Sequence, residues 1–422
     1  MTSSRLDKMN ITTINHDELV KIIKRVYEVK QSLFVQGGIG IGKSFCARTA
    51  AKEIAKELHM EFVETKDPNR YPDKFALLDI RLAQKDAGEI LGLPENYAVI
   101  KRKDKNDKPV IDMVPTKALD IFMKLNNTCE VHDIEYVTRW TSPSWFPRGG
   151  YGIMFLDEFN LAPPLVQYNM YELINDRALG DYYLPEGWVT LAAGNRGVED
   201  GAPVFDFASP LNNRFMWYEL EIPTIGGITS NKPNWTKWAI ENKLDVRVIG
   251  FLQTKTSALY NFKPNNREKA FPTPRSWHRV SNIIKGVTDE ELVELYAAGL
   301  VGTYTAGEFR AFLQAKRKLP PTEKYINDPK GTKLPETDDL LYVLCINLME
   351  YFLSVKDQKE GIEAMRSIVI FSERLWKETK KMEFAVFLLK LVKIADVKYF
   401  TNNVIQLDEF DNISGDIKKY LL

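Results

Sequence analysis

The stretch Gly37-Gly38-Ile39-Gly40-Ile41-Gly42-Lys43-Ser44 decides the fold of this chain. It fits the pattern G-x-x-x-x-G-K-[ST] in full. An apolar run at 32–36 precedes it, as a strand would, and apolar residues recur at helical spacing over 44–60. Glycines let the backbone curl so that successive N–H groups point inward, and the N-terminus of the following helix adds partial positive charge there. The stretch therefore predicts a phosphate-binding loop between a strand and a helix.

The composition of this loop also predicts which residues hold a nucleotide. Lys43 is expected to reach the β- and γ-phosphates, and the Ser44 hydroxyl to ligate Mg²⁺. The alternative is a glycine-rich turn that happens to precede Lys-Ser, which the complete pattern and its strand–helix setting disfavour. The residues expected to bind the nucleoside triphosphate are Gly37, Gly38, Ile39, Gly40, Ile41, Gly42, Lys43, Ser44, Phe45 and Asp157.

An acidic pair, Asp157-Glu158, closes a continuous apolar run at 152–156. Such a run is typical of a central strand buried on both faces. Carboxylates at its C-terminal end lie where open parallel sheets bind ligands. We expect Asp157 to hold the Mg²⁺ shell and Glu158 to accept a proton from an attacking water. The pair would otherwise be a solvated strand end, and the phosphate loop favours the functional interpretation.

The next apolar run along the chain, at 188–193, is followed by a polar residue, Asn195, as expected if this strand also ends at the nucleotide site. An amide at the end of this strand, 188–193, is suited to position a water near the γ-phosphate. Asn195 is equally a turn former, because asparagine after glycine tolerates left-handed conformations. Its order and context favour the site.

Short apolar runs alternate with helical patterns in the first half of the chain, which predicts an α/β fold with a parallel sheet. Further strands are expected at 75–80 and 216–222. Beyond about 223 helical patterns dominate, and 319–334 has the composition of a linker. These shifts predict a nucleotide-binding core (1–225), a helical domain (226–318) and a C-terminal helical extension (335–422). The helices expected after the core are 235–252, 277–284, 290–300, 340–353, 362–375 and 384–395.

Composition bounds the function class. The chain has 422 residues, and its 57 basic residues balance its 57 acidic residues, so no global attraction to nucleic acid or anionic membrane is visible. The three cysteines, Cys46, Cys129 and Cys345, are scattered, which argues against disulfides and zinc. No signal peptide and no apolar run of membrane-spanning length is apparent, so a cytoplasmic location is expected.

Two arginine segments complete a resemblance to a known family. The phosphate loop, Asp157-Glu158, Asn195, Leu211-Asn-Asn-Arg214-Phe215 and Pro272-Thr-Pro-Arg275-Ser276 follow the motif order of AAA+ ATPases and most resemble the MoxR-like, dynein-related branch. The resemblance implies that Asn195 is sensor 1, Arg214 the arginine finger and Arg275 sensor 2 on a helical lid. The alternative for each arginine is an ordinary surface ion pair. Arg196, next to sensor 1, is a lesser candidate.

The resemblance also implies an assembly and a task. A finger acting in trans requires an oligomeric ring, commonly a hexamer in this family, and energy from hydrolysis would remodel a protein client. MoxR-like proteins work with a partner bearing a von Willebrand factor A domain, which this chain lacks. The resemblance further implies a helix-2-type insertion at about 91–117 and a β-hairpin before sensor 1 at 177–188. The aromatic stretch 140–146 departs from the family pattern; it is expected to pack on the core, with a subunit contact as the alternative.

Two other functions remain open from the sequence. One is a nucleic-acid-processing AAA+ motor or a GTP-using relative, because the lysine-rich segment 101–108 would touch a polynucleotide if it faced a central channel. Its alternating charges favour a solvated loop instead. The other is an inert nucleotide-dependent scaffold, which the intact Glu158 disfavours.

Overall fold

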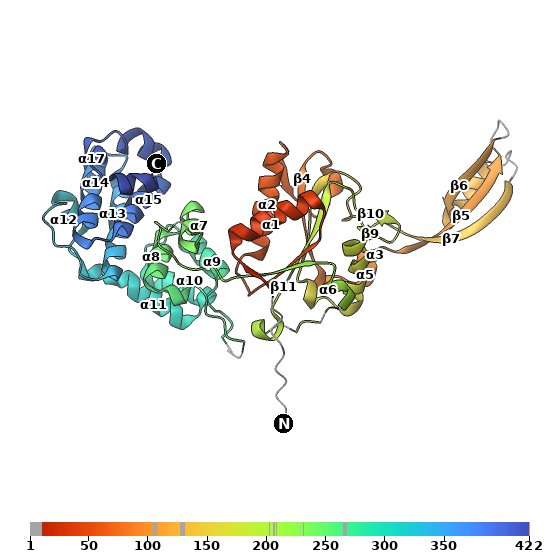
Figure 1. Cartoon of the computed structure of the whole chain (residues 1–422), viewed down its shortest axis with the longest axis horizontal. Coiled ribbons are helices and arrows are strands. Elements are labelled where there is room, and N and C mark those ends of the chain that lie inside the picture. Colours follow the sequence, from red (N-terminus) through yellow and green to blue (C-terminus); the bar gives the residue numbers. More distant parts are fainter. Residues whose placement is uncertain are drawn as a thin grey trace, which may run out of the picture. The chain divides into compact units, whose positions relative to one another are not determined.

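The computed structural model describes residues 11–103, 108–126, 131–201, 203–205, 207, 209–230, 232–264 and 268–421. Cys129 and part of the lysine-rich segment, 104–107, lie outside the described residues. The chain divides into two compact units (Figure 1). The first contains the residues up to Leu220 except Gly38–Gly42, and the second contains Gly38–Gly42 and the residues from Glu221 onward.

The first unit is built on a parallel seven-stranded sheet of order β1-β12-β2-β11-β8-β4-β3. The central strand β11 is buried along its whole length, as expected of a strand covered on both faces. The α/β fold class predicted from the sequence is therefore confirmed. The strands are β1 (Thr13–Ile14), β2 (Leu33–Gln36), β3 (Phe62–Glu64), β4 (Phe75–Arg81), β8 (Tyr151–Asp157), β11 (Trp188–Gly194) and β12 (Met216–Leu220).

Helices cover both faces of this sheet. On one face α1 (His16–Val29) and α2 (Lys43–Glu57) pack against each other and against β8, β4 and β11. On the other face α5 (Pro164–Asn175) buries Val166, Met170 and Leu173 in a core with Phe34, Leu78 and other strand residues. Shorter helices in this unit are α3 (Ala87–Leu91), α4 (Leu119–Leu125) and α6 (Ser209–Asn212), and β9 (Ala178–Leu179) and β10 (Tyr182–Tyr183) form the expected antiparallel hairpin.

The segment that begins near residue 91 extends well beyond residue 117. It is a separate antiparallel sheet of order β6-β5-β7, which we call the arm (Figure 1). Its strands are β5 (Pro94–Lys103), β6 (Pro109–Pro115) and β7 (Val131–Trp140). The expected end at 117 was wrong, because β7 pairs with β5 over nearly its whole length and returns the chain to the core only after Trp140. Of the aromatic stretch 140–146, Phe146 packs in the core as expected, whereas Trp140 is exposed.

The described residues of the second unit form helices and connecting segments, and none of them forms a strand. Its helices are α7 (Trp235–Glu241), α8 (Val246–Thr254), α9 (Pro274–Ile284), α10 (Glu290–Val301), α11 (Thr303–Gln314), α12 (Thr322–Asn327), α13 (Asp338–Val355), α14 (Glu360–Thr379), α15 (Met382–Ala395), α16 (Val397–Tyr399), α17 (Asp408–Asp411) and α18 (Gly415–Leu421). One hydrophobic core runs through it, from Ile228 to Leu421. The helical domain and C-terminal extension expected from the sequence thus share a core, and their separation stays a prediction.

Two expected elements of this unit were wrong in detail. The single helix expected over 235–252 is two helices, because Lys243 adopts a left-handed conformation and Asp245 then caps α8 by accepting from the Arg247 N–H. The expected linker contains α12, whose Tyr325 is fully buried. Among the described residues, no helix combines the length and apolar character needed to cross a membrane.

Candidate functional site

The phosphate-loop sequence lies where the motif predicts it, between β2 and α2. Gly40 and Gly42 adopt φ angles of 70° and 114°, which are accessible to glycine at little cost. A Cβ at Gly40 would also come within 2.9 Å of the Thr273 hydroxyl oxygen. Lys43 and Ser44 are the first two residues of α2, and Phe45 follows them in its first turn. Their backbone N–H groups therefore lie at the N-terminus of the helix, where the helix dipole favours an anion.

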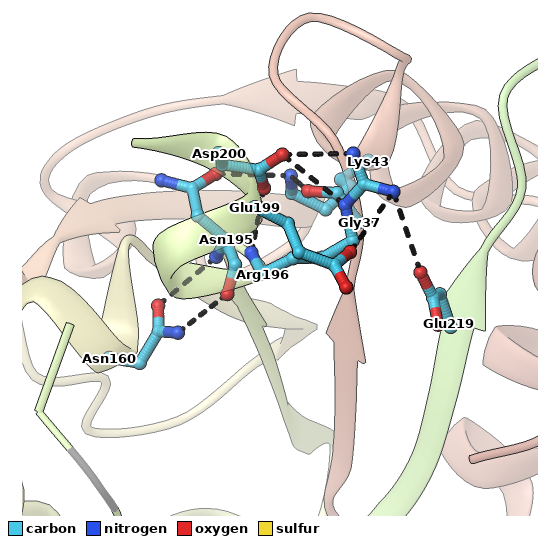
Figure 2. Close-up of polar contacts among 8 residues, drawn as sticks. All are labelled: Gly37, Lys43, Asn160, Asn195, Arg196, Glu199, Asp200 and Glu219. Carbon is cyan, nitrogen blue, oxygen red and sulfur yellow. Dashed lines mark hydrogen bonds and ion pairs between the residues drawn. The ribbon is translucent and has the colours of Figure 1, made fainter. Parts of the chain in front are cut away.

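The Lys43 ammonium lies between two oxygens of the first unit (Figure 2). Its Nζ donates to the Gly37 carbonyl at 2.6 Å and to the Asn195 side-chain oxygen at 3.4 Å. Lys43 and Asn195 are 152 residues apart in the sequence. They meet because β2 and β11 are parallel neighbours, so their carboxyl ends reach the same edge of the sheet.

Ser44 and the acidic pair also meet at this edge. The Ser44 hydroxyl donates to Asp157 Oδ2 at 3.3 Å, which joins the start of α2 to the end of β8. The Glu158 N–H donates to Asp157 Oδ1 at 2.9 Å. A hydroxyl and a carboxylate are oxygen ligands of the kind that Mg²⁺ prefers, so Ser44 and Asp157 fit the predicted metal. The described residues contain no cluster of three or more His, Cys, Asp or Glu suited to a metal.

Glu158 has an unusual backbone conformation. Its φ of 56° and ψ of 34° lie in the left-handed region, which disfavours a residue with a side chain. No hydrogen bond or ion pair joins its carboxylate to any described residue. Backbone strain of this kind is concentrated at functional sites.

Asn195 is held by a residue that the sequence did not single out. The side chain of Asn160 donates from Nδ2 to the Asn195 carbonyl at 2.7 Å and accepts from the Asn195 N–H at 3.1 Å (Figure 2). Asn160 lies in the short 3-10 turn Phe159–Leu161 after Glu158 and is only 9% exposed. Its only sequence signal is its position two residues after the acidic pair.

Arg214 and Arg275, which the family resemblance singled out, differ from Arg196 in their ion pairing. Arg196 is bound to carboxylates, with its guanidinium 2.9 Å from Asp200 and 3.8 Å from both Glu199 and Glu219 (Figure 2). Arg214 and Arg275 are exposed, and neither side chain pairs with a described residue. Arg196 therefore forms ordinary ion pairs, whereas the structure gives no support for such pairs at Arg214 or Arg275.

Arg275 is tied to the phosphate loop through its backbone. Within the second unit its N–H donates to the Gly40 carbonyl at 3.1 Å. The start of α9 is fixed by a capping box, in which Thr273 accepts from the Ser276 N–H and Ser276 accepts from the Thr273 N–H. Pro274 at the first helical position is preorganised for this start.

Asp79 is a second polar residue that the sequence did not reveal. It lies on β4, directly opposite Phe155 of β8, and so on the same face of the sheet as Asp157. Burial raises the pKa of Asp79 above its ordinary value, and the nearby Asp157 carboxylate raises it further. Its Oδ1 accepts no hydrogen bond from the described residues. A lone aspartate within an apolar strand has no motif around it.

No family model matches this sequence, and no curated protein matches it. Among solved structures, the chain is similar to NtrX from Brucella abortus in complex with ADP, at 13% identity and a TM-score of 0.32, covering 90% of this chain and 68% of that chain. NtrX in complex with ATP gives 14% identity and a TM-score of 0.32, covering 91% and 69%. A RuvB variant from Thermotoga maritima gives 14% identity and a TM-score of 0.32, covering 79% and 83%. Because these values are low, the function is inferred from the residues of this chain.

Proposed function

We propose that this chain is an ATPase of the AAA+ class, which binds ATP with Mg²⁺ at Gly37–Ser44 and hydrolyses it to ADP and phosphate. The observation that carries this proposal is that the carboxyl ends of β2, β8 and β11 bring their side chains together. Lys43 at the end of the phosphate loop bonds Asn195 after β11, and Ser44 bonds Asp157 at the end of β8. Nucleotide-binding α/β sheets bind phosphate at this edge.

Each residue then has a chemical role. Lys43 and the first N–H groups of α2 bind the phosphates, while Ser44 and Asp157 hold Mg²⁺, whose charge neutralises phosphate oxygens. Glu158 takes the proton of the attacking water, a task that suits a carboxylate without a hydrogen bond to described residues. Asn195 orients that water.

Arg214 and Arg275 supply positive charge where the transferred phosphoryl group develops negative charge. Both guanidinium groups are exposed and have no carboxylate partner among the described residues, which supports this role. We assign Arg214 the role of an arginine finger acting in a neighbouring subunit, so the active form is a homo-oligomeric ring, which we take to be a hexamer.

The task of such a ring is the remodelling or activation of a partner protein, as in the MoxR-like branch, with a separate von Willebrand factor A-type protein as the expected partner. The alternative of a nucleic-acid motor or GTP-using relative gains no support from the arm. Lys101, Arg102 and Lys117 are each paired with an acidic residue of the arm itself.

The direct test is phosphate release from ATP and from GTP in the presence of Mg²⁺. Lys43→Ala is expected to lower turnover about 100-fold or more, because it removes a cation from the transferring phosphates. Lys56→Ala is the matched control, since Lys56 is an exposed lysine near the end of the same helix. Full turnover by the Lys43 variant would refute the site. Stimulation by DNA or RNA that fades with salt would favour the nucleic-acid alternative.

A further inference from the structure

Asn160 contacts the polypeptide backbone on both sides of Asn195 Cα. It accepts from the N–H and donates to the C=O of the same residue. A backbone N–H only donates and a C=O only accepts, so the partner must offer one acceptor and one donor at a fixed spacing. A side-chain amide meets this requirement, whereas a carboxylate, which lacks the donor, does not.

The packing around this contact is tight. A Cβ on Gly194, the last residue of β11, would lie 2.4 Å from Asn160 Oδ1 and 2.6 Å from Cζ of Phe34. The absence of a side chain at Gly194 therefore lets the Asn160 amide approach the end of the strand. In addition, the Phe205 N–H donates to the Asn160 carbonyl at 2.8 Å, which fixes the backbone of Asn160 itself.

Asn160 and Lys43 hold Asn195 in different ways. Successive side chains along a strand point to opposite faces of the sheet. Ala192 lies on the face that packs against α5, whereas the Asn195 side chain meets Lys43 near the start of α2. Lys43 contacts the amide side chain of Asn195, and Asn160 contacts its backbone. Asn160 also follows Glu158 by two residues, so its hydrogen bonds link the turn that carries Glu158 to the residue after β11.

We propose that Asn160 is a positioning residue for hydrolysis, which fixes the Asn195 backbone relative to the turn that carries Glu158. This inference rests on the proposed function. A water held by Asn195 must lie within hydrogen-bond reach of Glu158, and a displacement of about 1 Å in such a pair costs roughly 100-fold in rate. Asn160 contributes to kcat through Asn195 and has no part in binding the nucleotide.

The test measures kcat, KM and nucleotide affinity for Asn160→Asp and Asn160→Ala in the full chain. Asn160→Asp keeps the size of the side chain and the acceptor for the Asn195 N–H but removes the donor. Both variants are expected to lower kcat roughly 10- to 100-fold, with KM for ATP and ADP affinity within about twofold of the unchanged chain. The matched control is Asn175→Ala, which removes a half-buried asparagine side chain at the end of α5 and leaves kcat unchanged.

A double-substitution cycle separates positioning from a general structural effect. In an Asn195→Ala background, Asn160→Ala is expected to cause no further loss of kcat, because the side chain it positions is already absent. A full additional loss in that background would overturn the inference, as would an unchanged kcat in both Asn160 variants. Should Asn160→Ala fail to fold, the same cycle is run with Asn160→Asp.

The result is distinguishable from failure of the proposed function. If the unchanged chain hydrolyses no nucleotide, or Lys43→Ala and Asn195→Ala retain full turnover, the proposed function fails. If those two variants lose turnover and the Asn160 variants keep it, only the positioning role fails.

Discussion

At the scale of single residues, Glu158 combines a strained backbone with a proposed catalytic carboxylate. The left-handed conformation costs a non-glycine residue roughly 1–2 kcal/mol. Its N–H is bound to Asp157, so the strand end and the turn together hold it in this conformation. The same local geometry that presents Glu158 therefore lowers the stability of the first unit.

This opposition predicts that stability and activity change in opposite directions at residue 158. Glu158→Gly relieves the strain, and after glycine's own entropy cost of about 0.5–1 kcal/mol it is expected to raise the free energy of unfolding by about 1 kcal/mol or less. Glu158→Gln keeps the strain and should leave stability unchanged. Both variants are expected to lose turnover by about 100-fold or more. Denaturant unfolding and phosphate release measure the two effects, and equal stability of the glycine and glutamine variants would contradict the strain.

At the scale of elements, the arm is joined to the core through two neighbouring segments, at Gly92–Leu93 and at Thr141, which we call the arm base. Thr141 N–H donates to the Leu93 carbonyl at 2.9 Å, and the Thr141 hydroxyl accepts from the Leu93 N–H at 2.9 Å. The Tyr182 hydroxyl of the β9–β10 hairpin donates to the Trp140 carbonyl at 3.0 Å. The chain that follows this hairpin enters β11, so the arm base, the hairpin and the strand before Asn195 are connected through hydrogen bonds and sequence.

Gly92 allows the two chain segments at the base of the arm to lie close together. Its φ is 87°, and a Cβ there would lie 1.8 Å from the Thr141 carbonyl oxygen. Gly92→Ala is therefore expected to destabilise the first unit by roughly 1–3 kcal/mol, the usual cost of such strain, and to expose the arm base to proteases. Gly88→Ala is the matched control, because the new methyl group meets only ordinary contact in α3 and alanine favours a helix. Thermal unfolding with limited proteolysis checks both, and equal behaviour of the two variants would refute the role of Gly92.

At the scale of the whole molecule, the two arginines proposed to act on the phosphoryl group belong to different compact units. Arg214 belongs to the first unit, whereas Arg275 belongs to the second together with Gly40, to which its N–H is bound. A finger that acts on a neighbour also makes hydrolysis a property of the assembly. Activity per chain should then rise with protein concentration as the ring forms.

Mixing two inactive variants tests action in trans. Arg214→Ala keeps an intact phosphate loop and Lys43→Ala keeps an intact finger, so a neighbouring pair in the right order restores one complete site. In an equal random mixture about one quarter of the interfaces are complete, and turnover should recover to about that fraction. Arg25→Ala mixed with Lys43→Ala is the control, since Arg25 is an exposed arginine of α1 paired with Glu28. No recovery in the first mixture, with both variants assembled, would exclude a finger in trans.

The sequence by itself determined the parallel α/β fold, the strand–loop–helix setting of Lys43 and Ser44, and the position of Asp157 at the end of a buried strand. These features are local, because glycine conformation, apolar runs and helical spacing act over a few neighbouring residues. The tertiary structure was needed to distinguish the arginines, because ion pairs depend on which residues lie nearby after folding. Arg196 pairs with Glu219, whereas Arg214 and Arg275 have no partner among the described residues.

Only the tertiary structure decided the supporting contacts. Asn160 and Asn195 are 35 residues apart, and Asp79 approaches Asp157 only because β4 and β8 pair in parallel. The arm was underestimated because β7 alternates in polarity with no signal of its partner strand. Such contacts arise from strand order and register, which are set by packing across the whole sheet and leave no mark at short range in the sequence.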